Sequence, residues 1–212
     1  MKESIKQITK ICVKHMREFS ENNGINLKST DAHELVAAFF GYNTRTSMLE
    51  DKKYPLSNLP MANLIVLIPS ALINDRRCAL EGLPSNLQES NLLGEEIFIR
   101  LAYEKFIVAT KAWSYHDLKR QAILLAHEYR NHKKLYMLYF DPDHEDVAVE
   151  RLDEGILITI TPYYESIRGS EFKNVLTSIL TTIWLKRIAG HIGFAEPEIN
   201  TRSIPMLYKK QS

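Results

Sequence analysis

The 212-residue sequence has few of the features that mark specialised classes of protein. It contains two cysteines, Cys12 and Cys78, which are far apart and outside any Cys-x-x-Cys pair. This scarcity excludes a zinc ribbon and a disulfide-rich scaffold, and it is typical of a protein in a reducing compartment. We expect both cysteines to be small, buried, apolar groups.

Long hydrophobic runs and an excess of charge are also missing. No apolar stretch approaches the roughly 20 residues needed to span a bilayer, and residues 1–10 lack the apolar core of a signal peptide. The 27 Lys and Arg residues nearly balance the 26 Asp and Glu residues, unlike the composition of a nucleic-acid coat protein. The sequence therefore predicts a cytoplasmic protein without a membrane partner.

The N-terminal quarter carries the pattern of a small three-helix module, residues 1–53. Apolar residues recur there at three- and four-residue spacing in three stretches, as on the buried faces of helices. The stretches are separated by Asn23-Gly24 and by Gly41, and glycine is favoured just past a helix C-terminus. Residues 54–60 contain two prolines and predict a linker to a second domain.

Residues 61–193 predict an α+β domain. Short apolar runs at 63–68, 135–140 and 156–161 favour strands, the spacing at 70–82, 114–129 and 170–189 favours helices, and 97–108 fits either. Residues 194–212 contain two prolines and are expected to form a loosely attached tail. The predicted fold class is α+β, a small helical module joined to a larger domain with a short sheet and long helices.

The strongest catalytic candidate is LLAHEYRNHKK at 124–134, which begins like the H-E-x-x-H motif of zinc hydrolases. In that motif two histidines one helical turn apart bind one metal, and the glutamate activates water. Here His127 and His132 are five residues apart, about 140° around a helix. The spacing argues against a shared zinc ion. We expect that the protein binds no cofactor and is not an enzyme. A hydrolase assembled from distant residues, with His127 and Glu128 among them, is the third hypothesis.

The segment VAAFFGYNTRTSMLED, residues 36–51, matches part of the pattern of a DNA-binding helix-turn-helix. Ala37, Gly41 and Thr44 fit its first half, but Ser47 and Glu50 stand where a recognition helix buries apolar residues. A DNA-binding regulator is therefore the alternative function. Its predicted nucleic-acid contacts are Arg45, Lys119, Arg120, Lys133 and Lys134.

The segment STDAHELVAAFFGYNTRTSMLED, residues 29–51, resembles a small helical segment of bacterial proteins labelled glyoxalase-related, some of which are on plasmids or other mobile elements. The matching positions are Thr30, Ala32, Glu34, Leu35, Ala37, Gly41, Tyr42, Thr44 and, one place removed from the pattern, Leu49. The resemblance implies a bacterial source. It implies no activity, because the segment carries no metal-ligand set of a glyoxalase.

Charge is unevenly distributed along the chain. Residues 97–134 hold eight Lys and Arg against three acids, whereas 141–154, the expected loop of a hairpin, hold seven acids against one arginine. An acidic loop of this kind can meet a basic protein face. Our leading hypothesis is a non-enzymatic bacterial protein-interaction factor, such as an immunity or accessory protein of a mobile element. Its predicted partner-binding residues are Asp141, Asp143, Glu145, Asp146, Tyr136 and Tyr139.

Overall fold

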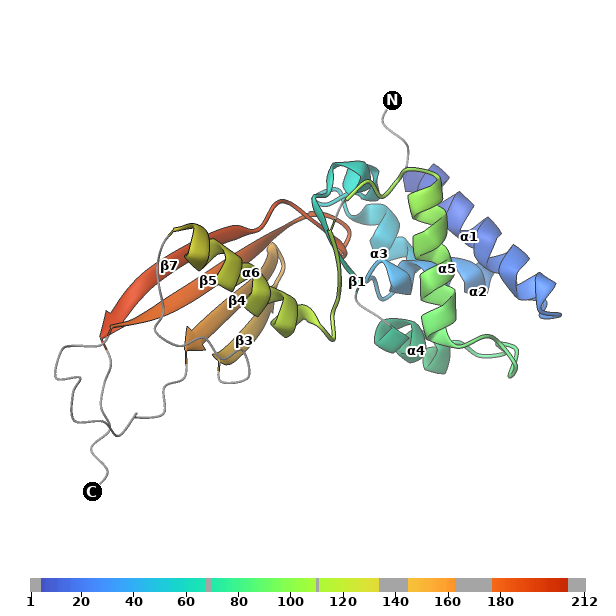
Figure 1. The fold of residues 1–212 in the computed structure, drawn as a ribbon. Helices are drawn as coiled ribbons and strands as arrows, with labels where there is room; N and C mark the ends of the chain where they lie inside the picture. Colours follow the sequence, from blue (N-terminus) through green and yellow to red (C-terminus); the bar gives the residue numbers. More distant parts are fainter. Residues whose placement is uncertain (1–4, 68–69, 110, 134–144, 163–176, 206–212) are drawn as a thin grey trace, which may run out of the picture. The chain divides into compact units, whose positions relative to one another are not determined.

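The computed structural model describes residues 5–67, 70–109, 111–133, 145–162 and 177–205. The chain forms two compact units (Figure 1). We call residues 1–115 with 187–196 the helical unit, and residues 116–186 with 197–212 the sheet unit. Helices and a mixed set of strands occur together in the chain, so the predicted α+β class is confirmed.

The helical unit is built from helices packed around an apolar core. Those described are α1 (Ile5–Asn22), α2 (Ser29–Phe39), α3 (Arg45–Glu50), η1 (Leu56–Met61), α4 (Ser70–Ala79) and α5 (Ser90–Tyr103). The three helices predicted within residues 1–53 are confirmed. Gly24 and Gly41 follow α1 and α2 with φ angles of 75° and 88°, where an L side chain would be strained. Thr44 caps α3 by accepting the N–H of Ser47 at 3.1 Å.

A few short strands complete the helical unit. Strand β1 (Leu64–Leu67) pairs in parallel with β2 (Lys111–Ser114), and in antiparallel with β6 (Gly193–Phe194). The last residues of β5 (Thr177–Ala189) pair with β6. Strand β1 confirms the prediction at 63–68, and its apolar run is buried because helices and strands of the unit surround it.

The sheet unit consists of one described helix, α6 (Leu118–His132), and a four-stranded antiparallel sheet. Its strands are β3 (Glu145–Leu152), β4 (Gly155–Pro162), β5 and β7 (Glu198–Pro205), in the order β3-β4-β5-β7. Helix α6 lies across one face of this sheet (Figure 1). That face is formed by buried side chains such as Ile158 and Ile183, and Arg130 of α6 donates from Nε to Thr181 Oγ1 at 2.9 Å.

The division of the chain differs from the expected one. Residues 54–60 were predicted to be a linker, but Leu56 and Leu59 of η1 are fully buried in the core of the helical unit. Pro60 is accommodated within this short 3₁₀ helix. Residues 64–115 fold with the N-terminal helices, so the first unit extends well beyond residue 53.

Several local predictions in the C-terminal half are wrong. The helix expected at 170–189 is strand β5 where the structure describes it, and the tail expected after 193 contains β7. Both strands are stabilised by pairing with each other, which is a distant interaction that a local pattern does not encode. The strand expected at 156–161 is confirmed as β4, and the one expected at 135–140 lies outside the described residues. Cys12 is buried as expected, but Cys78 is exposed on α4.

Candidate functional site

The sheet unit leaves one face of its sheet partly exposed. Successive side chains of a strand point to opposite faces, so the residues that alternate with the buried ones point away from α6. This open face comprises Asp146, Ala148, Glu150, Leu152, Leu157, Thr159, Thr161, Leu180, Thr182, Trp184, Lys186, Glu198, Asn200 and Arg202. All of these side chains are half-buried or exposed, whereas their neighbours under α6 are mostly buried. The open face can therefore contact another molecule, whereas α6 covers the opposite face.

An aromatic side chain lies on an inner strand of the open face, near the end of the sheet at which β4 and β7 begin. Trp184 on β5 is the register partner of Leu157 on β4, and directly opposed side chains of an antiparallel pair are in contact range. The indole ring of Trp184 also lies close to Gly155, two residues before Leu157. A Cβ added at Gly155 would be only 2.9 Å from Trp184 Cη2. The missing side chain at Gly155 thus gives the indole room to lie along the sheet.

The margin of the open face on β3 is acidic. Asp146 and Glu150 are both exposed there, and neither forms an ion pair with any described residue. Among the residues that the structure covers, β3 pairs only with β4 and is an end strand of the sheet. Leu157 separates half-buried Trp184 from Glu150, and Glu198 on β7 is the register partner of Trp184 on its other side, so acidic side chains flank the Leu157–Trp184 pair on both sides.

The structure places only part of the predicted acidic contact set. Glu145 and Asp146 begin strand β3, so the expected hairpin loop of 141–154 is wrong for 145–152, which form that strand. Asp141, Asp143, Tyr136 and Tyr139 lie outside the described residues. Asp146 is the one predicted contact residue whose side chain is described, and it belongs to the open face.

The basic residues predicted to contact nucleic acid belong to both units of the chain. Arg45 is exposed at the start of α3, which has six residues, and its backbone N–H donates to Glu34 at 3.2 Å. Lys119 and Arg120 begin α6, whereas Lys133 follows its last residue, about 20 Å away along the helix axis. Lys134 lies outside the described residues. These side chains do not form a single positive patch on α6.

The two histidines of the zinc-like segment at 124–134 lie on one regular helix. His127 and His132 both belong to α6, so the angle of about 140° between them applies. The Asn131 amide nitrogen lies 3.4 Å from the His127 ring nitrogens. Within the described ranges, no three His, Cys, Asp or Glu side chains are grouped to hold a metal ion.

A dense polar cluster that was not predicted lies in the helical unit. Arg187 Nη2 is 2.6 Å from Asp51 Oδ2, and the Tyr42 hydroxyl donates to the same oxygen at 2.7 Å. The Arg187 guanidinium lies over the ring of Tyr54, 4.4 Å from its centroid. We call these four residues the Asp51 cluster. Its charged side chains are largely withdrawn from water, with 8% exposure for Arg187 and 14% for Asp51.

The protonation states of the Asp51 cluster are set by its hydrogen bonds. Burial raises the pKa of Asp51, but hydrogen bonds from Tyr42 and from the backbone of Tyr54, with the charge of Arg187, outweigh burial and lower it. Burial raises the pKa of Tyr42, and its hydrogen bond to Asp51 raises it further. Near neutral pH the carboxylate is charged and the phenol is neutral. The cluster thus has the character of a fixed ion pair rather than of an acid–base pair poised for proton transfer.

The Asp51 cluster sits beside the turn between β5 and β6. Gly190 donates its N–H to the Tyr54 carbonyl at 2.9 Å, and His191 donates to the Phe40 carbonyl at 3.0 Å. The Arg187 Nε–H donates to the Gly190 carbonyl. No sequence signal joins Asp51 to Arg187, which is 136 residues away, because each looks like an ordinary surface charge in its local pattern.

Comparison with known proteins identifies no relative: the chain matches no protein-family model, no curated protein and no solved structure. No helix in the described part of the chain combines the length and apolar character needed to cross a bilayer.

Proposed function

We propose that this chain is a non-enzymatic interaction protein whose sheet unit binds a partner protein on the open face. The observation that carries the proposal is the Leu157–Trp184 pair, which is half-buried on the side of the sheet away from α6. The exposed carboxylates of Asp146 and Glu150 border the same face.

This combination of side chains suits protein recognition. Tryptophan is among the residues most enriched at interface positions that dominate binding energy, because it buries a large area and loses few rotamers. Charged residues at the margin of an interface mainly steer encounter and select the partner. The acidic margin therefore favours a partner with Lys or Arg around an apolar contact.

The proposal includes a bacterial setting. An immunity or accessory protein of a mobile element acts by binding another protein, and the open face offers a surface for such binding. The reason for placing the chain there is the resemblance of residues 29–51 to bacterial proteins of which some are on plasmids or other mobile elements.

A tagged pull-down from a bacterial lysate tests the proposal if open-face variants are compared with the wild type. We expect one stoichiometric protein partner for the wild type, and recovery reduced roughly tenfold or more by Trp184→Ala. The double charge reversal D146K/E150K should have a similar effect, and it changes only exposed side chains, so folding is preserved.

The matched control is L124A/E128K, which changes an exposed apolar residue and an exposed acid on α6. This variant should capture the partner as well as the wild type does. Capture that is equal for all variants, or the absence of any stoichiometric partner, would contradict the proposed role of the open face.

A further inference from the structure

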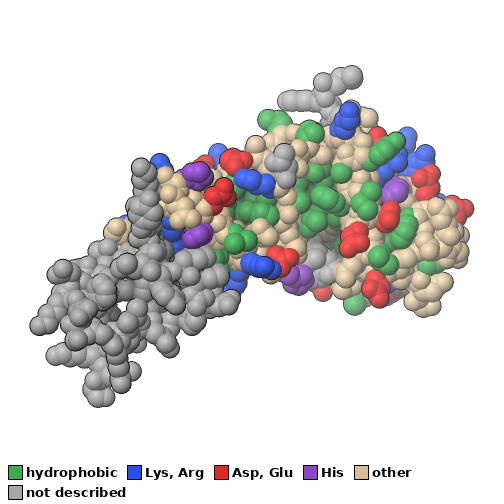
Figure 2. All heavy atoms as spheres, in the orientation of Figure 1, with side chains coloured by type: hydrophobic (Ala, Val, Ile, Leu, Met, Phe, Trp, Pro, Cys, Tyr) green, Lys and Arg blue, Asp and Glu red, His purple; other side chains and the backbone are tan. Residues whose placement is uncertain are grey.

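The first thirteen residues of α1, 5–17, carry positive charge without any negative charge. They contain Lys6, Lys10, Lys14 and Arg17 and no Asp or Glu, and all four cationic side chains are exposed. At 100° and 1.5 Å per residue, the four positions fall within an arc of about 80° and extend about 16 Å along the helix. We call these four residues the basic arc; Figure 2 shows Lys and Arg side chains at the surface of the helical unit in this region.

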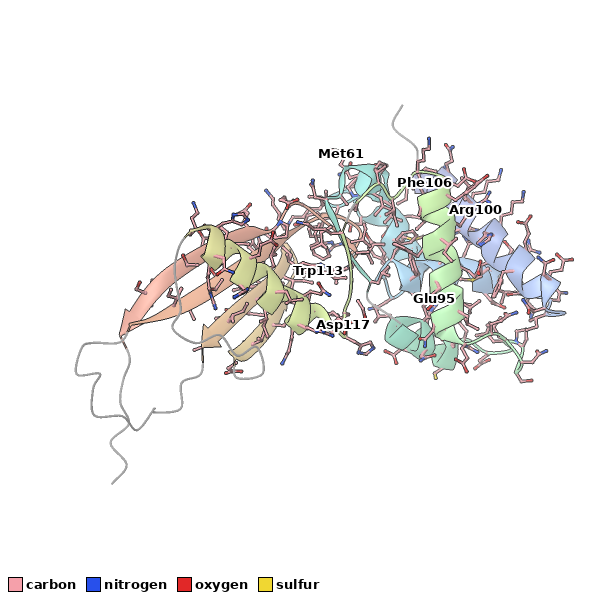
Figure 3. The ribbon with its side chains drawn as sticks, viewed as in Figure 1. Met61, Glu95, Arg100, Phe106, Trp113 and Asp117 are labelled. Atoms are coloured by element: carbon pink, nitrogen blue, oxygen red, sulfur yellow. The ribbon has the colours of Figure 1, made fainter. Side chains whose placement is uncertain are left out.

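Two acidic side chains of α5 near the basic arc have partners, whereas Glu21 of α1, one turn beyond Arg17 and on the same side of the helix, is exposed and forms no ion pair with a described residue. On α5, which packs beside α1, Glu96 is bonded to His15 at 2.9 Å. Glu104 is paired at 2.6 Å with Arg100, which Figure 3 labels on α5. Glu18 lies 3.6 Å from Lys14 in an exposed pair, which contributes little in water. Lys6 and Lys10 form no ion pair with a described residue. The N-terminal part of the arc, Lys6 and Lys10 with the weakly paired Lys14, therefore keeps most of its charge for an external partner, whereas Glu21 lies one turn from Arg17.

The opposite side of α1 is fixed in the core of the helical unit. Ile8, Cys12 and Met16 are buried there at 1% exposure or less, so the helix cannot turn its apolar side toward a bilayer. Arg17 is held in place because its Nε–H donates to the Leu27 carbonyl at 3.0 Å. The cations are thus presented from a rigid support.

We propose that the basic arc binds the phosphate backbone of duplex nucleic acid. A duplex carries one negative charge per roughly 1.7 Å of axis, so a row of cations about 16 Å long meets several phosphates at once. Protein interfaces are depleted in lysine and use exposed aromatic anchors, and the arc has three lysines and no exposed aromatic side chain. Contacts of this kind neutralise phosphates without reading bases, so binding is independent of sequence.

Fluorescence anisotropy with the full chain and a labelled 24-base-pair DNA of mixed sequence tests this site. Between 50 and 200 mM NaCl, four phosphate contacts give a slope of log K against log salt of about −3.6, which is roughly a 150-fold loss of affinity. In K6Q/K10Q/K14Q we expect the slope to become shallower by about 2.7, and affinity at 50 mM NaCl to fall at least roughly tenfold.

The control R45Q/K119Q/R120Q removes three exposed positive charges elsewhere, at positions that the helix-turn-helix hypothesis would use. It should bind DNA as the wild type does. Equal losses in the two triple variants, or unchanged binding by K6Q/K10Q/K14Q, would overturn the proposal, as would binding to phosphatidylserine vesicles without binding to DNA. The protein partner of the open face should still be captured by K6Q/K10Q/K14Q, so the two proposals fail independently.

Discussion

Asp51 carries a partly buried charge, 14% exposed, whose bonding capacity is fully used. Its two carboxylate oxygens accept from the Tyr42 hydroxyl, the Arg187 guanidinium and the backbone N–H groups of Lys53 and Tyr54. An ion pair withdrawn from water offsets its desolvation only when such additional hydrogen bonds are made. Removing one member leaves the other charge buried and uncompensated, so the cluster is more sensitive to mutation than a surface pair.

Replacing Asp51 with asparagine should therefore destabilise the protein by about 3 kcal/mol, because Arg187 loses its counter-ion. Urea unfolding followed by circular dichroism at pH 7 measures the loss. Asp75→Asn on α4 is the control, since that carboxylate is exposed, and it should change the free energy of unfolding by less than about 0.5 kcal/mol. Equal effects of the two substitutions would show that Asp51 does not stabilise the fold through its partners.

The stability due to Asp51 should also depend on pH in a defined direction. Its folded-state pKa is lowered from 3.8, so the stabilisation is fully present above that value and is lost as pH falls through the lowered pKa. Protonated aspartate resembles asparagine, so the difference in unfolding free energy between wild type and Asp51→Asn should be constant from pH 7 to about 5. Below about pH 4 it should shrink. A difference that grows in acid would mean that the pKa is raised instead.

At the scale of elements, the exit from α2 depends on the absence of a side chain. Gly41 has a φ of 88°, and a Cβ there would overlap the side chain of His191, with its Cγ at 3.0 Å. His191 cannot withdraw easily, because its N–H is bonded to the Phe40 carbonyl. The junction between α2 and the β5–β6 turn is thus set by backbone geometry as much as by apolar packing.

Two glycine substitutions separate these effects. Gly24 has a similar φ of 75° but open space around it, so Gly24→Ala should cost only about 1–2 kcal/mol of backbone strain. Gly41→Ala carries the same strain and in addition the overlap with His191, which adds about 1–3 kcal/mol. Chemical denaturation of both variants gives the comparison. Equal losses would indicate that His191 moves aside without cost.

The helices near the N-terminus could be predicted because their signals are local. Their apolar spacing and the glycines that end them fall within short windows of sequence. Strand β5 could not: Ile179 and Ile183 are four residues apart, which suits a helix, but Ile183 and Leu185 also alternate with Thr182 and Trp184 as in a strand. Only pairing with β4 and β7 decides between the two, and that pairing is distant in sequence.

The candidate site could be predicted only in part, for a similar reason. The acidic segment was visible as composition, and Asp146 does lie on the open face. Trp184 lies within residues 170–189, which the sequence predicted to be a helix, so the strand register that places it opposite Leu157 could not be seen. The basic arc could be predicted from the sequence, because residues 5–17 show both its helical spacing and their lack of acidic residues. The contacts of Glu96 with His15 and of Glu104 with Arg100 could not be predicted in this way.

At the scale of the whole molecule, the two units are not successive segments of the chain. The chain leaves the helical unit after Tyr115, returns to it at Arg187, and leaves again after Glu196. The returning segment supplies Arg187 to the Asp51 cluster and β6 to the edge of β1. The helical unit is incomplete without it.

A fragment of residues 1–115 should therefore fail to fold cooperatively. It lacks β6 and Arg187, which leaves β1 without one neighbour and Asp51 buried without its counter-ion. We expect no sigmoidal urea transition for the fragment alone, and recovery of the transition when residues 116–212 are co-expressed with it. A cooperative transition of 1–115 with the stability of the full chain would contradict the role given to the returning segment.

The return of Arg187 through Glu196 also has a consequence for synthesis on the ribosome. When residue 115 has been added, 81 more residues are needed before the helical unit has all its parts. At 5–20 residues per second, this delay is on the order of 4–16 s. During that interval the nascent N-terminal segment exposes apolar surface, and it is then a substrate for chaperones that bind such surface.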